Sequence, residues 1–218
     1  MNFSKIEKAM CDWTGQLGFP LITVELESES DNEINLKLSQ VKFSAIEGKS
    51  SNSTTIWNCP IKILTPNGEH EILFDKKESI ITVPGTTKAS WIMLNSNSAG
   101  FYHVQYSPQL FDRLLKNVEN FSTIDRLKIS SDMYCLTRAG LESSVKFLQL
   151  FESYKSETEY SVLSDIIAGV DALKPFAAHI DKTEDLNQII KNTISKAANQ
   201  LGWDAKSNEA HSAPLLRY

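Results

Sequence analysis

The sequence predicts a multi-domain β + α protein in which an antiparallel β-sandwich is followed by an incomplete α-solenoid-like helical array. Hydrophobic side chains alternate with period two between residues 20 and 106, as in strands with one buried face. From residue 107 onward the hydrophobic spacing becomes helical, with short consecutive segments. A chain of 218 residues is long enough for one large domain or two small ones. We therefore expect a boundary between residues 106 and 107.

Residues 1–19 are expected to form a separate helix before the sandwich. Its hydrophobic residues fall at helical spacing: Phe3, Ile6, Met10, Trp13 and Leu17. Gly18-Phe-Pro20 ends the pattern. This hydrophobic stripe must pack either on the sandwich or on a domain outside this chain, and the sequence does not distinguish the two.

The β-sandwich domain is expected over residues 20–106. About seven short strands at spacings of 8–15 residues are typical of a sandwich. The expected strands are residues 21–27, 34–38, 56–64, 71–74, 79–83, 90–94 and 101–106. Clusters of Gly, Pro, Asn and Ser separate these strands and indicate turns.

The helical domain is expected over residues 107–218. Ser107-Pro108 predicts an N-cap followed by proline in the first turn. Ser122-Thr-Ile-Asp125 resembles a capping box, which opens a second helix ending at Ala139-Gly140. The remaining helices are expected around 145–151, over 160–173 with a stop at Pro175, and over 186–201 behind a cap at 181–184.

Composition excludes several classes of function. Lys and Arg total 22 against 27 Asp and Glu, so the formal net charge is -5. Such a chain lacks the positive charge that binding to nucleic acid or to an anionic membrane requires. The three cysteines have neither metal-ligand nor redox spacing, which predicts free thiols in a reducing compartment. Because no signal peptide or membrane span is visible, we expect a cytoplasmic protein.

A search for catalytic motifs identifies none. The helical zinc-hydrolase motif needs two histidines four residues apart, but Phe74 stands four residues after His70. No phosphate-binding glycine loop and no Gly-x-Ser-x-Gly elbow is present. We therefore predict no catalytic, cofactor-binding or metal-binding residue in this chain.

Several motifs carry a family resemblance that runs in order along the chain. They include Trp13-Thr-Gly-Gln-Leu-Gly-Phe-Pro, Gly100-Phe101-Tyr102-His103 and Asp125-Arg126-Leu. Near the end stand Leu201-Gly-Trp203-Asp204 and then Glu209, His211 and Arg217. The order and spacing of these motifs resemble those of zinc-dependent aminopeptidases of the puromycin-sensitive aminopeptidase group.

The resemblance implies a parent enzyme that uses zinc to remove N-terminal residues from peptides. It implies that residues 1–19 are the terminal helix of a catalytic domain and that 107–218 are the first part of a C-terminal helical domain. The family's zinc motif and amine-binding motif are absent here. We therefore expect a non-catalytic linking and active-site-enclosing portion that is inactive alone. Its expected partners are the catalytic domain and further helices of the same parent chain, and the parent's peptide substrate.

The singled-out residues have expected structural roles. Tyr102 and His103 are expected in a strand at the end of the sandwich, with a hinge contact as the alternative. His103 stands where the family usually has Arg, so an ion pair there would be lost or pH-dependent. Asp125 and Arg126 are expected to open a helix, where Asp125 favours the positive helix end and Arg126 pairs across to another helix. Substrate contact is the alternative.

Trp203, Asp204, Glu209 and His211 are expected in a loop fixed by a buried Trp and a polar network. Glu209 and His211 are two potential metal ligands, and two ligands do not make a site.

A stand-alone protein-binding adaptor, built from the sandwich and helices without catalysis, is the alternative function. The segment 212–218 is apolar where a stand-alone solenoid needs a polar cap, which favours a truncated array. Exposed apolar ends would then allow self-association.

Overall fold

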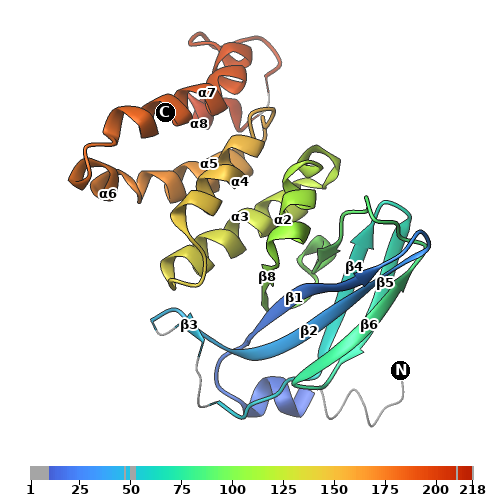
Figure 1. The fold of residues 1–218 in the computed structure, drawn as a ribbon. Helices are drawn as coiled ribbons and strands as arrows, with labels where there is room; N and C mark the ends of the chain where they lie inside the picture. The colour runs from blue at the N-terminus through green and yellow to red at the C-terminus, as the bar shows by residue number, and fades with distance from the viewer. Residues whose placement is uncertain (1–9, 47, 50–52, 210, 218) are drawn as a thin grey trace. The chain divides into compact units, whose positions relative to one another are not determined.

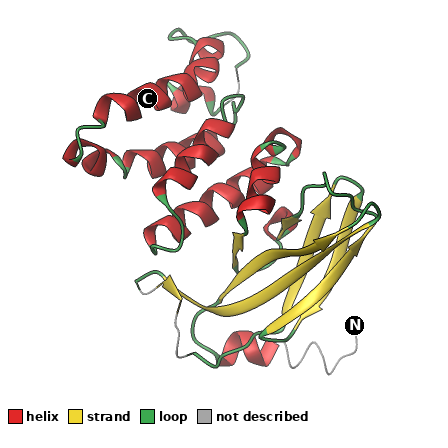
Figure 2. Cartoon of the chain, in the orientation of Figure 1, coloured by secondary structure: helices red, strands yellow, loops and turns green. Residues whose placement is uncertain are grey.

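The computed structural model describes residues 10–46, 48–49, 53–209 and 211–217. The chain forms two compact units, which are described separately. Unit 1 comprises residues 1–117 together with 138–141, and unit 2 comprises residues 118–137 and 142–218. The first unit contains the strands and the second is helical (Figure 2). The predicted β-plus-α class is therefore confirmed.

Unit 1 contains two sheets. The larger has the order β3-β2-β1-β8, with β6 also paired to β2, and the smaller has the order β5-β4-β7 (Figure 1). The strands of the larger sheet are β1 (Pro20–Glu29), β2 (Glu33–Ser44), β3 (Gly48–Lys49), β6 (Glu78–Pro84) and β8 (His103–Tyr106). Those of the smaller sheet are β4 (Cys59–Thr65), β5 (Gly68–Phe74) and β7 (Met93–Leu94).

One strand pair departs from the expected antiparallel arrangement. Strand β8 lies parallel to β1, with Leu21 opposite His103 and Val24 opposite Tyr106. A parallel pair requires a long connection between its strands, and here the connection includes all the other strands of the unit. Period-two alternation is the same in both pairings, so it could not distinguish them.

The core of unit 1 is hydrophobic, with one buried amide that ties loops to β2. Leu21, Leu36 and Trp57 are fully buried. The side-chain Nε2 of Gln40 donates to the carbonyls of Trp57 (3.0 Å) and Lys76 (2.9 Å), and its Oε1 accepts from the Trp57 N–H (2.9 Å). This amide satisfies backbone groups that burial would otherwise leave unpaired.

Residues 10–15 are helical and attach to the segment before β4. The indole Nε1 of Trp13 donates to the Asn58 carbonyl at 3.1 Å, and the Trp13 and Trp57 rings lie 6.3 Å apart. Met10 and Leu17 remain mostly exposed, so only part of the predicted stripe packs on unit 1. Phe3 and Ile6 lie outside the described residues.

The helices begin close to the predicted caps. In unit 1, α2 (Pro108–Leu115) follows Ser107 and contacts β1 and β8. In unit 2, α3 (Thr123–Arg138) is capped by Ser122, whose Oγ accepts from the Asp125 N–H (3.2 Å) and donates to the Asp125 carboxylate (2.7 Å). The short 3₁₀ segments are η1 (Ser96–Ser98) and η2 (Val118–Asn120).

The rest of unit 2 is an array of helices, several of them short. They are α4 (Ser144–Ser153), α5 (Tyr160–Asp171), α6 (Lys174–His179), α7 (Thr183–Leu201) and α8 (Ala213–Leu216). Two predicted boundaries shift. Pro175 does not end the helical region, because it occupies the first turn of α6, where proline is tolerated. The predicted cap at 181–184 forms no side-chain cap bond, and Asp181 adopts a left-handed φ of 54°.

All three cysteines are free thiols, as predicted. Burial, reinforced by the nearby Asp12 carboxylate, raises the pKa of the Cys59 thiol to about 12. Among the described helices, none is both long and apolar enough to cross a membrane.

Candidate functional site

The candidate residues lie in separate parts of the structure. Trp13 anchors the helical residues 10–15, and the Gly100–His103 segment leads into β8. Asp125 and Arg126 lie in α3, whereas the residues from Trp203 to Arg217 surround α8. They therefore form several local networks and not one active-site constellation.

The segment before β8 is held by Asn95, a fully buried residue with a left-handed φ of 64°. Its carboxamide accepts from the Gly100 N–H (2.7 Å) and donates to the Gly100 carbonyl (2.8 Å). A Cβ on Gly100 would lie 2.2 Å from Cε1 of the buried Tyr102. Gly100 is thus required by the close approach of the Tyr102 ring to the backbone.

His103 lies in an aromatic cluster at the edge of unit 1. Its ring makes edge-on contacts with Phe19 (5.1 Å between centroids) and Phe43 (4.7 Å). Phe101 makes an edge contact with Phe19 but is 70% exposed. Of the two residues expected in a sandwich-end strand, His103 begins β8 and Tyr102 directly precedes it.

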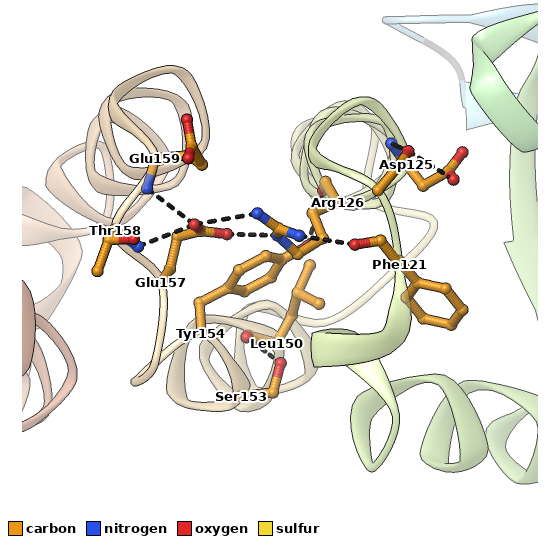
Figure 3. A network of polar contacts seen from close by, with 10 residues as sticks. Phe121, Asp125, Arg126, Leu150, Ser153, Tyr154, Glu157, Thr158 and Glu159 are labelled. Carbon is orange, nitrogen blue, oxygen red and sulfur yellow. Dashed lines mark hydrogen bonds and ion pairs between the residues drawn. The ribbon is translucent and has the colours of Figure 1, made fainter. Parts of the chain in front are cut away.

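Arg126 is the centre of a polar network between α3 and the connection from α4 to α5 (Figure 3). Its Nε donates to Oε2 of Glu157 at 2.5 Å, and one terminal nitrogen donates to Oε1 at 3.2 Å. The other terminal nitrogen donates to the Phe121 carbonyl at 2.6 Å. Glu157 is almost completely buried, so this two-point ion pair is shielded from water.

Glu157 also caps the start of α5. Its Oε1 accepts from the backbone N–H groups of Thr158 (2.8 Å) and Glu159 (2.9 Å), directly before the helix. A carboxylate is favourable there because a helix N-terminus carries partial positive charge and unpaired N–H donors. Arg126 and Glu157 thus join the ends of two helical segments.

Tyr154 completes the network from α4's C-terminal side. Its hydroxyl donates to the Arg126 carbonyl at 2.7 Å. Burial strongly raises the pKa of the Tyr154 phenol, and the neighbouring Glu157 carboxylate adds to this effect while Arg126 opposes it. The phenol therefore stays protonated and acts as a fixed donor, not as a proton carrier.

A cavity of about 310 Å³ opens beside this network. Its lining is mainly polar and includes Arg126, Tyr154, Glu157 and Lys196. The Arg126 guanidinium is already committed to Glu157 and Phe121. The arrangement supports a structural role for Arg126, and Asp125 bonds to Ser122 at the helix start. Neither Asp125 nor Arg126 is placed to act as a general acid or base, because both side chains are engaged in hydrogen bonds within the fold.

A second network closes the loop before α8. Two nitrogens of Arg217 donate to Glu209 (2.9 and 2.5 Å), and the guanidinium also donates to the carbonyls of Gly202 (3.1 Å) and Asp204 (3.0 Å). The bonds from Arg217 and from the Lys206 N–H lower the pKa of the Glu209 carboxyl to about 2. Of the residues expected in a polar network here, Glu209 takes part through its side chain and Asp204 through its backbone carbonyl.

The prediction that Trp203 is buried was wrong. Trp203 is 89% exposed, and Arg217 binds the backbone carbonyls of the residues on both sides of it. His211 is also exposed and forms no part of the bonds between Arg217 and Glu209.

Within the described ranges, no group of three or more His, Cys, Asp or Glu side chains is arranged to hold a metal ion. Sequence reasoning missed Glu157, Gln40 and Asn95, which each make three or more hydrogen bonds. The only local signal was the position of Glu157 just before a predicted helix, because the other partners are distant in sequence.

Comparison with known proteins shows the family to which this chain of two sheets and a helical array belongs. The family model of the ERAP1-like C-terminal domain matches residues 91–218 of this chain. The chain belongs to this family, as more than half of it is matched. The expected family resemblance is confirmed.

Related proteins match nearly the whole chain. Aminopeptidase M1-A of Oryza sativa subsp. japonica is 31% identical over 97% of this chain, which corresponds to 24% of the relative. Aminopeptidase M1 of Arabidopsis thaliana is 30% identical over 97% of this chain and 25% of its own length. The puromycin-sensitive aminopeptidase of Caenorhabditis elegans is 26% identical over 97% of this chain and 23% of its own length. The chain thus spans about a quarter of these curated relatives.

Proposed function

We propose that this chain is the non-catalytic linking and active-site-enclosing portion of a zinc metallo-aminopeptidase that removes N-terminal residues from peptides. The observation that carries the proposal is the match of nearly the whole chain to about a quarter of proteins named aminopeptidases. In the parent, zinc would polarise the scissile carbonyl and activate water. The parent's peptide substrate and its cytoplasmic location belong to the same proposal.

The internal chemistry of the chain supports a structural role. The Arg126–Glu157 pair joins two helical segments, and Arg217 closes a loop, so the strong polar groups are used within the fold. An active site instead needs acids, bases or donors aimed at a reacting atom. The domain assignment is part of the same proposal: 1–19 as the end of a catalytic domain, 20–106 as the sandwich and 107–218 as the start of the helical domain.

The test measures catalysis and metal content in the purified 218-residue chain. We expect mass spectrometry of the metal content to find no stoichiometric zinc. We also expect no hydrolysis of an aminoacyl-amide dye, with or without added zinc. A purified aminopeptidase provides the positive control. Stoichiometric zinc together with dye hydrolysis would overturn the proposal.

The size of the native product distinguishes the alternative function. An antibody against this chain should detect a band several-fold larger than 24.5 kDa in the source cells, and the immunoprecipitate should hydrolyse the dye. A single band at 24.5 kDa without associated activity would instead favour the stand-alone protein-binding adaptor.

A further inference from the structure

An open cavity of about 610 Å³ lies between α7 and the connection that follows α4. Helices α4 and α7 are in contact, and all the lining residues belong to unit 2. Lys155 and Ser156 line the cavity from the connection, and five polar residues of α7 line it from the helix. This cavity differs from the one beside Arg126, although Ser156 and Lys196 border both.

The α7 side of the cavity is a polar stripe of the helix. Asn192, Lys196 and Asn199 follow one another at spacings of four and three residues, which places their side chains on one face. The acidic residues of α7 are confined to its first turn, at Glu184 and Asp185. The positive charge of Lys196 is therefore not offset by a neighbouring acid of the same helix.

The lining of the cavity is rich in hydrogen-bond donors. Each lining side chain is a lysine, serine, asparagine or glutamine, and all of these can donate. The Asn192 Oδ1 accepts from Nε2 of Gln188 at 2.7 Å, which leaves the Asn192 Nδ2 group as a donor. Neither Lys155 nor Lys196 forms an ion pair with any residue that the structure describes. The cavity thus offers two ammonium groups from two different elements.

The neighbouring carboxylates line the other cavity. Glu119, Glu157 and Glu159 border the cavity beside Arg126, and none of the three borders this one. The Glu157 charge is already held by Arg126. Two like charges beside one cavity repel each other, and a bound anion turns this repulsion into attraction.

We propose that this cavity binds a small phosphate ester through the ammonium groups of Lys155 and Lys196. A phosphate dianion matches two cations, and lysine is a common phosphate ligand in proteins. The amides of Asn192 and Asn199 both donate and accept, as hydroxyl groups of the ester require. The lining contains no aromatic ring on which a base could stack, which favours a sugar or polyol phosphate over a nucleotide.

This binding function does not depend on the proposed parent enzyme, because it uses residues of unit 2 alone. The test is isothermal titration calorimetry of the 218-residue chain with glucose 6-phosphate, inorganic phosphate and glucose as probes. We expect glucose 6-phosphate to bind saturably and inorganic phosphate to bind about tenfold more weakly, because it lacks the hydroxyl contacts. Glucose should not bind detectably. Added salt should weaken the binding of glucose 6-phosphate by screening the charges.

Lys196→Gln removes one ammonium group and keeps a polar side chain. It should weaken glucose 6-phosphate binding by about tenfold or more, the usual effect of losing a charged hydrogen bond. Lys155→Gln should have a similar effect. The matched control is Lys191→Gln, which removes the same charge from an exposed position of α7 outside the cavity. This control should leave the affinity unchanged.

The location of the ligand is checked by backbone amide chemical shifts of the isotope-labelled chain. Glucose 6-phosphate should shift the signals of residues 155–156 and 192–200, which surround the cavity. The signals of β1 and β2 should not move, because both strands belong to unit 1.

The proposal is wrong if glucose 6-phosphate does not bind saturably, or if Lys191→Gln weakens binding as much as Lys196→Gln. Equal affinities for inorganic phosphate and glucose 6-phosphate would identify an adventitious ion only. Circular dichroism checks that each variant folds. Because Lys155 is exposed, Lys155→Gln decides the outcome if Lys196→Gln does not fold.

Discussion

Gly100 shows how a single residue can be fixed by one close contact. Replacement by alanine places a Cβ against the buried Tyr102 ring, which must then shift. We expect Gly100→Ala to lower the free energy of unfolding by about 1–3 kcal/mol, the usual cost of overpacking. Gly15→Ala is the matched control, because nothing lies within 4 Å of that Cβ position. Equal thermal midpoints for the two variants would show that the Tyr102 ring moves without cost.

Arg126 neutralises a carboxylate that the fold has removed from water. Arg126→Met would leave Glu157 buried without its cation, so we expect this variant to lower the free energy of unfolding by about 3–5 kcal/mol. Lys174→Met breaks a half-exposed ion pair with Asp171 and should cost only about 0–1 kcal/mol. Urea denaturation followed by far-ultraviolet circular dichroism compares them. A similar loss in both variants would contradict the structural role assigned to Arg126.

Glu209 makes the loop before α8 sensitive to acid. Its folded-state pKa of about 2 lies below the ordinary value of 4.5, so ionised Glu209 stabilises the loop above pH 4.5. This stabilisation should disappear as the pH falls from 4.5 toward 2. The measurement is the fluorescence of Trp203 in a Trp13, Trp57 and Trp91→Phe background.

Glu209→Gln supplies the control for the acid titration. It should remove the part of the Trp203 signal that changes between pH 4.5 and 2. An unchanged titration in this variant would assign the transition to other carboxylates.

At the scale of elements, the serines that precede α4 and α2 differ in their hydrogen bonds. The Ser143 side chain accepts from the Lys146 N–H at 3.2 Å at the start of α4. Ser107 precedes α2 without a side-chain cap bond, and its buried Oγ has no hydrogen-bond partner. We expect Ser143→Ala to cost about 1 kcal/mol, whereas Ser107→Ala should be close to neutral because it removes an unsatisfied hydroxyl. Chemical denaturation of both variants checks this, and the reverse order of costs would refute it.

The elements also show which features the sequence could predict. Amphipathic segments such as β1, β2 and α2 were predictable because their hydrophobic period reflects one buried face. The Ser122 cap was predictable because its partner is local. The parallel pairing of β8 with β1 and the ion pair between Arg126 and Glu157 were not, because both join residues that are distant in sequence.

Among the candidate site residues, the sequence indicated a polar network around Glu209 but not its partner. Arg217, eight residues further on, forms the ion pair with Glu209. The exposure of Trp203 was not predictable, because a large apolar residue is usually buried.

At the scale of the whole molecule, the chain passes between the units more than once. It leaves unit 1 after residue 117, returns for 138–141 and then completes unit 2. The returning segment is bonded within unit 1, where the Gln105 amide donates to the Leu141 carbonyl at 3.0 Å. Neither unit is therefore one continuous stretch of sequence.

This interleaved path limits how the protein can be rearranged. A single recombination event after residue 117 would transfer unit 2 together with residues 138–141, which belong to unit 1. A hybrid made with a distant relative would then carry a foreign segment opposite its own Gln105. We expect working hybrids to keep residues 105 and 138–141 from the same parent, so these two stretches should be inherited together.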